Sequence, residues 1–282
     1  MQLRHIVAAT DESEAGRQAV WTAVELAASA GARVTVLRAV QIEARVVTGI
    51  AETRPMGEVD EEQGAPAIDR LRRWVEADLP PIDSAPPIQY AVTFGVPGIE
   101  IARFAERVGA DLLVLGRKPR SRMVRLLLGD TADAVARRSR LPCLFVPPAR
   151  TPPRDLLVAI DGSERGMAVL EAGDAFARTI GARLRVVTVE PDQAGEPDAL
   201  AASTPATHSL GIRSRVQGVL RREVEVRRGQ PVEAILAAVD EQAPDVLVLG
   251  CHRGGPAGII EAGRTSRRLT HTAPCAVLTV PL

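Results

Sequence analysis

The stretch DLLVLG, residues 111–116, returns as DVLVLG at residues 245–250. The sequences upstream match as well, because HIVAATDESEAG, which starts at His5, aligns with LLVAIDGSERG, which starts at Leu156. Asp11 and Asp161 lie 150 positions apart, whereas Gly116 and Gly250 lie 134 apart. The chain of 282 residues therefore contains one domain twice, and the first copy carries 16 (150 − 134) additional residues.

Short apolar runs at residues 6–10 and 156–160 are typical of strands that are buried on both faces of a parallel sheet. After each run, Ser13 or Ser163 is placed to cap a helix, and we expect these helices to reach about Ala30 and Ile180. Gly31 and Gly181 follow, where a left-handed residue ends a helix.

The second and third strands are expected at 34–40 and 88–94 in the first copy and at 184–190 and 223–227 in the second. The fourth strand of each copy is the repeated stretch, and the fifth lies at the end of the copy. Helices begin near Pro97 and Pro231. This alternation predicts an α/β protein with two tandem, doubly wound, open parallel five-stranded sheets that have helices on both faces.

The predicted domains cover residues 1–148 and 155–282, and the proline-rich segment 149–154 is a semi-rigid linker. The additional residues of the first copy are assigned to surface loops within 41–66 and 79–87, on either side of a helix at 67–78.

The composition excludes several classes of function. The formal net charge is zero and only 2% of the residues are aromatic, which argues against nucleic acid as a partner. No apolar run reaches the ~20 residues that a bilayer span needs, so no membrane partner is expected. Three cysteines without metal-ligand spacing indicate reduced thiols, so we expect a soluble, cytoplasmic protein.

Doubly wound sheets bind ligands past the carboxyl ends of their strands, at the point where the strand order reverses. Three residues of each copy fall there: Asp11, Val40 and Gly116 in the first, and Asp161, Val189 and Gly250 in the second.

These features together resemble the universal stress protein family in its tandem-domain form, over essentially the whole chain. The resemblance rests on D-x-S after the first strand, on GA before the second, and on the repeated stretch before a glycine-bearing loop. It implies the Rossmann-like fold of the adenine nucleotide alpha hydrolases. In nucleotide-binding members the loop is similar to GxxG, nine residues, then glycine and Ser or Thr, in which backbone amides and a helix N-terminus hold phosphate.

The first copy departs from this pattern. Gly116 and Gly129 match its outer glycines, but Pro119 replaces the second glycine and Asp130 replaces the hydroxyl residue. A carboxylate ~4 Å from a phosphate oxygen repels it by about 4 kcal/mol at an effective dielectric constant near 20. A charged hydrogen bond contributes only about 1.5–3 kcal/mol. Phosphate binding is therefore disfavoured here unless magnesium bridges the two groups.

The second copy remains compatible with ATP or another adenine nucleotide, bound with magnesium. Arg253 and Arg264 stand at the glycine and hydroxyl positions, where an arginine binds phosphate well, and Thr265 offers a hydroxyl one residue later. The candidate binding residues of this copy are Asp161, Val189, Gly250, Arg253, Gly254, Gly263, Arg264 and Thr265.

Other residues invite a functional and a structural interpretation. Asp11 and Asp161 either contact a nucleoside, as the resemblance implies, or only support the helix caps. The basic stretch from Arg117 to Arg125 is expected to be a solvated loop rather than a binding site for an anionic partner. Cys251 stands beside His252 without a third group, so we predict no catalytic role for it.

We therefore expect a non-enzymatic stress-response binding protein, without catalytic or metal-ligating residues. The alternatives are a weak ATP-hydrolysing enzyme that uses the second copy, and a protein that binds a lipid or another non-nucleotide molecule. The last strands, within LPCLFVP (141–147) and CAVLTVP (275–281), are expected to pair the two domains within one chain, and the chain is expected to form a homodimer.

Overall fold

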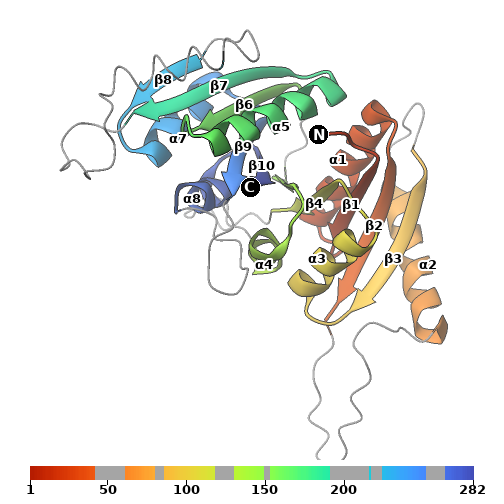
Figure 1. Cartoon of the computed structure of the whole chain (residues 1–282). Coiled ribbons are helices and arrows are strands. Elements are labelled where there is room, and N and C mark those ends of the chain that lie inside the picture. The colour runs from red at the N-terminus through yellow and green to blue at the C-terminus, as the bar shows by residue number, and fades with distance from the viewer. Residues whose placement is uncertain are drawn as a thin grey trace, which may run out of the picture. The chain divides into compact units, whose positions relative to one another are not determined.

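The computed structural model describes residues 1–41, 61–79, 86–117, 130–148, 153–190, 216, 224–251 and 264–282 (Figure 1). The chain divides into two compact units: domain 1 comprises Leu3–Pro119 and Leu128–Arg150, and the main part of domain 2 is Thr151–Leu282. Each domain contains five parallel strands, which confirms the predicted α/β class and the repeat. The predicted boundaries and linker stay a prediction, because residues 149–152 lie outside the described residues.

Domain 1 consists of β1 (His5–Thr10), α1 (Glu14–Ala30), β2 (Arg33–Val40), α2 (Glu61–Asp78), β3 (Ile88–Phe94), α3 (Pro97–Arg107), β4 (Leu112–Gly116), α4 (Asp130–Arg138) and β5 (Cys143–Val146). Its strand order is β3-β2-β1-β4-β5. The order reverses between β1 and β4, so the crevice that suits a ligand lies at their carboxyl ends.

Domain 2 consists of β6 (Asp155–Ile160), α5 (Glu164–Ile180), β7 (Arg183–Glu190), β8 (Val224–Arg228), α7 (Pro231–Gln242), β9 (Val246–Cys251), α8 (Arg264–Thr272) and β10 (Ala276–Pro281). Its order, β8-β7-β6-β9-β10, repeats that of domain 1. The reversal point lies between β6 and β9.

Strand alternation divides each core into two layers, as domain 2 illustrates. Leu157 and Leu247 are fully buried in a cluster with α7 and α8. Their neighbours Val158 and Val248 face α5, because a Cβ built on Gly173 of that helix would lie 2.9 and 3.6 Å from their methyl groups. Helices therefore cover both faces of the sheet, as predicted.

The predicted helix ends are confirmed in both domains. Ser13 accepts a hydrogen bond from the Gly16 amide at the start of α1, and Ser163 caps α5 in the same way. Gly31 and Gly181 end these helices with φ of 65° and 69°. Glycine adopts this left-handed conformation without the Cβ clash of other residues.

Helix α2 is longer than predicted. It begins at Glu61 and holds Pro66 inside, whereas the sequence predicted a loop up to residue 66. A proline removes one helical hydrogen bond and usually stops a helix. Here it lies in the second turn, where the helix continues past it.

The aspartate that opens each repeated stretch has a structural role. Asp111 Oδ2 accepts hydrogen bonds from the amides of Arg4 and His5, at 2.9 and 3.0 Å. Asp245 Oδ2 does the same for Arg154 and Asp155, at 2.8 and 2.9 Å. This residue holds the start of each central strand, which accounts for its presence in both copies.

Candidate ligand-binding site

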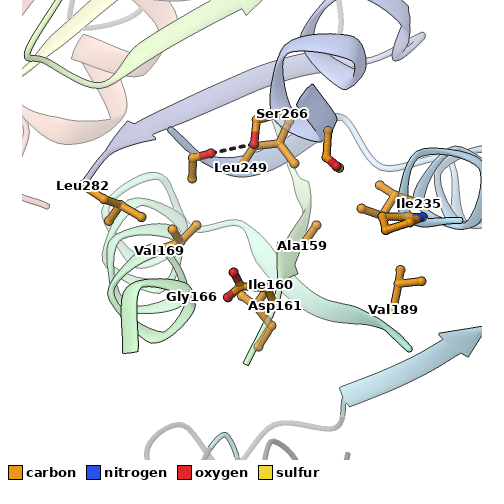
Figure 2. A pocket seen from close by; sticks show the side chains of 13 residues that line it. Ala159, Ile160, Asp161, Gly166, Val169, Val189, Ile235, Leu249, Ser266 and Leu282 are labelled. Atoms are coloured by element: carbon orange, nitrogen blue, oxygen red, sulfur yellow. Dashed lines mark hydrogen bonds between the residues drawn. The ribbon is translucent and has the colours of Figure 1, made fainter. Parts of the chain in front are cut away.

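A cavity of about 260 Å³ opens in domain 2 at the carboxyl ends of β6, β7 and β9 (Figure 2). Four residues that the sequence predicted line it, namely Asp161, Val189, Gly250 and Thr265. They come from three strand ends and from the first turn of α8. The structure therefore brings together residues that are up to 104 positions apart (265 − 161) in the sequence.

The turn after β6 places Asp161 at the cavity. Its Oδ1 accepts hydrogen bonds from the amide and the hydroxyl of Ser163, at 3.0 and 2.6 Å. A Cβ on Gly166 would lie 2.6 Å from the same oxygen, so only glycine lets α5 begin this close to the carboxylate. Asp161 thus supports the helix cap and lines the cavity at once.

The polar end of the cavity contains a residue that the sequence did not predict. Ser266 lines the cavity and donates a hydrogen bond of 2.7 Å to the carbonyl oxygen of Gly250. This bond ties the first turn of α8 to the end of β9. The sequence GRTS at residues 263–266 indicates this serine only weakly, because the sequence alone does not show which of these residues faces the sheet.

The other walls are largely apolar. Figure 2 shows Val169 and Leu282 on one side of the cavity, Ile235 and Val189 on the other, and Asp161 between them. A Cβ on Gly250 would lie 2.7 Å from Val169, so this glycine leaves the room that a side chain would fill. The arrangement suits a ligand with a flat apolar part and a polar end.

The loop between β9 and α8 carries further predicted binding residues. Arg253, Gly254 and Gly263 lie outside the described residues, and Arg264 is the first residue of α8 with its side chain outside them. The first turn of α8 contains no acidic residue, whereas the first turn of α4 contains Asp130 and Asp133. A helix N-terminus favours negative charge, so α8 offers an anion a better site than α4 does.

In domain 1, Asp11, Val40 and Gly116 lie at or just beyond the carboxyl ends of β1, β2 and β4, as predicted, and Gly129 lies outside the described residues. Glu12, directly after Asp11, forms an ion pair with Arg38 of β2. Burial and the nearby charge of Arg70 lower the pKa of Arg38.

Domain 2 has no equivalent of this ion pair. Gly162 and Thr188 stand 150 positions after Glu12 and Arg38. Charged side chains therefore bridge the ends of β1 and β2, whereas the residues at the two matching positions of β6 and β7 carry no charge.

The prediction of a solvated basic loop is wrong for its first member. Arg117 is fully buried, and its amide donates a 2.7 Å hydrogen bond to the carbonyl oxygen of Val146, because the backbone continues beside β5 beyond the end of β4. Residues 118–125 lie outside the described part of the chain.

Cys251 is not an activated thiol. Only 4% of its surface is exposed, and this burial raises the pKa of its thiol to about 11. A neutral, buried thiol is a poor nucleophile. Within the part of the chain that the structure describes, no group of three or more His, Cys, Asp or Glu side chains is placed to hold a metal ion.

Comparisons with known proteins point to one family. The family model described as "Universal stress protein family" matches residues 2–147 and 153–281. A universal stress protein of Thermus aquaticus is 32% identical over 134 residues, which are 45% of this chain and 98% of that protein. A universal stress protein of Mycobacterium tuberculosis is 27% identical over 192 residues, which are 62% of this chain and 66% of that protein.

Among solved structures, a universal stress protein from Archaeoglobus fulgidus aligns with a TM-score of 0.69 at 20% identity, covering 100% of this chain and 99% of the other. This likeness concerns the fold alone. The family model, however, matches nearly the whole sequence in two repeats. The chain belongs to the universal stress protein family and contains two tandem domains of it.

Proposed function

We propose that this protein is a non-enzymatic, cytoplasmic stress-response binding protein that holds one adenine nucleotide in domain 2. The observation that carries the proposal is the cavity at the carboxyl ends of β6, β7 and β9. It combines apolar walls with Asp161, Gly250 and Thr265, which the sequence predicted for such a ligand.

Each part of the cavity suits one part of the nucleotide. Val189 and Ile235 offer apolar contact for a purine ring. The carboxylate of Asp161 is an acceptor for a ligand hydroxyl group, and Thr265 is a donor at the N-terminus of α8 for phosphate oxygens. Arg253, Gly254, Gly263 and Arg264 complete the proposed phosphate site, and magnesium would accompany ATP.

Domain 1 is proposed to bind no nucleotide. The ion pair between Glu12 and Arg38 joins the ends of β1 and β2 beside its crevice, and Asp130 places a negative charge in the first turn of α4. Both features disfavour a phosphate-bearing ligand.

The test is a thermal-shift and calorimetric titration of the full chain with ATP, ADP and AMP, with and without magnesium. A nucleotide at 100 times its dissociation constant stabilises the domain that binds it by about 2.7 kcal/mol. We expect one site per chain. Thr265→Glu should weaken binding of ATP at least ~10-fold by repulsion of phosphate. Its domain 1 counterpart, Thr131→Glu, should leave binding unchanged.

No stabilisation by any nucleotide would refute the proposal. Mass spectrometry of the molecule that co-purifies with the protein addresses the alternatives, since a bound lipid or other metabolite would favour a non-nucleotide ligand. Release of phosphate from ATP above the buffer blank would instead favour the enzyme.

We further propose that β5 and β10 pair the two domains within the chain, and that two chains form a homodimer. Each of these strands is the last one in its own domain and carries apolar residues, such as Leu144 and Leu278. Light scattering should then give twice the chain mass of 30.0 kDa. Hydrogen exchange should be slow along both strands. A monomeric mass or fast exchange in both strands would contradict this arrangement.

A further inference from the structure

The N-terminal parts of α3 and α4 touch closely in domain 1. A Cβ built on Gly98 would lie 2.4 Å from the Cβ of Ala134 and 3.2 Å from the carbonyl oxygen of Thr131. Real Cβ atoms do not approach to 2.4 Å, so the two helices can lie at this spacing only because Gly98 has no side chain.

The corresponding positions of domain 2 carry larger side chains. Val232 and Arg268 stand 134 positions after Gly98 and Ala134. Val232 is buried in the core cluster that also contains Leu269 of α8. Arg268 extends toward α7, where its Nη2 lies 3.3 Å from Glu233 Oε1.

The cavity of domain 2 lies at the corresponding parts of α7 and α8. Pro231 and Ile235 of α7 and Thr265 and Ser266 of α8 line it. The loops before α4 and α8 have equal length in the sequence, because Gly116 precedes Gly129 by 13 positions and Gly250 precedes Gly263 by the same 13. The residues at the facing positions differ in size: Val232 is buried, whereas Arg268, with 62% of its side chain exposed, reaches from α8 to Glu233 of α7 at the surface.

We infer that Val232 and Arg268 are positioning residues that hold α7 and α8 apart and so keep the ligand cavity of domain 2 open. Gly98 and Ala134, the residues at the same positions in domain 1, let the helices close. The inference rests on the proposed function only for the identity of the ligand, since the spacing itself is a property of the protein.

The experiment exchanges these residues for those of domain 1. The variant Val232→Gly/Arg268→Ala should bind ATP at least ~10-fold more weakly than the wild type. Its crystal structure should show a smaller cavity between α7 and α8. Val232→Ala/Arg268→Ala, which retains more helix propensity, replaces the first variant if that one does not fold.

Two control variants separate the effect of side-chain size from the effect of the positive charge and of the ion pair. Val232→Ile/Arg268→Met keeps the bulk without the cation and should retain wild-type affinity. Glu233→Ala removes the exposed ion pair alone, which is a weak interaction, and should also bind normally. A loss of affinity in Val232→Ile/Arg268→Met would overturn the inference, because charge would then be decisive.

The remaining outcomes distinguish this inference from the proposed function. Wild-type affinity in Val232→Gly/Arg268→Ala overturns the inference and leaves the proposed function intact. A wild type that binds none of ATP, ADP and AMP refutes the proposed function, and the crystal structure of the same variant then decides the inference alone. A smaller cavity supports it, and an unchanged cavity overturns it.

Discussion

Glu12 and Gly162 follow the first strand of their domains, and both take the left-handed backbone conformation, with φ of 61° and 76°. Glycine adopts it without strain, whereas another residue in a sparsely populated backbone region costs about 1–3 kcal/mol. Glu12 offsets part of this cost by its ion pair with Arg38. The two positions therefore differ in backbone strain and, together with Arg38 and Thr188, in charge.

His5 makes the stability of domain 1 depend on pH. Its Nε2 lies 2.8 Å from Thr35 Oγ1, and its Nδ1 lies 3.2 Å from Arg33 Nη2. Burial, and then the charge of Arg33, lower the pKa of His5 below its ordinary value of 6.5, although Asp111 acts in the opposite direction.

The unfolded chain then binds the proton more readily than the folded domain does. The stability that neutral His5 contributes is therefore fully present above pH 6.5 and is lost as the pH falls through its lowered pKa in the folded domain. Urea unfolding at pH 8 and pH 5 should show a larger loss for the wild type than for His5→Gln. Equal losses in both proteins would show that another group is responsible.

At the scale of elements, the spacing of α3 and α4 depends on one missing Cβ. Gly98→Ala would place a methyl group 2.4 Å from the Cβ of Ala134. We expect it to destabilise domain 1 by about 1–3 kcal/mol, because overpacking forces the helices to shift.

A double-mutant cycle checks this prediction. In Gly98→Ala/Ala134→Gly the overlap is removed, so the combined loss should be smaller than the sum of the two single losses. Additive losses in urea unfolding would mean that the two helices do not constrain each other.

For the whole molecule, the proposed division of roles between the domains predicts unequal responses to a ligand. Scanning calorimetry should resolve separate transitions for two domains with separate cores. Ser13→Ala and Ser163→Ala each remove one helix cap, which costs about 1 kcal/mol, and so identify the transition of each domain.

ATP should then raise only the transition that Ser163→Ala lowers, because only the folded domain 2 binds it. A rise in the transition that Ser13→Ala lowers would place the nucleotide in domain 1. That result would contradict the division of roles between the domains.

The sequence by itself determined the repeat, the α/β class, the helix caps at Ser13 and Ser163, and the places of Asp161, Val189 and Gly250 at strand ends. All of these follow from local patterns, because strand burial, capping and turn chemistry act over a few neighbouring residues. Pro66 misled the prediction of α2 for the same reason, since a local rule was applied where the helix tolerates an exception.

Only the tertiary structure decided which contacts form beside each crevice. The ion pair of Glu12 with Arg38, the bond of Ser266 to Gly250 and the contact of Gly98 with Ala134 join residues 16 to 36 positions apart. Such contacts depend on the distance and angle at which packed elements meet, to within an ångström. Neither periodicity nor spacing specifies that distance, so two copies of one fold carry different contacts at matching places.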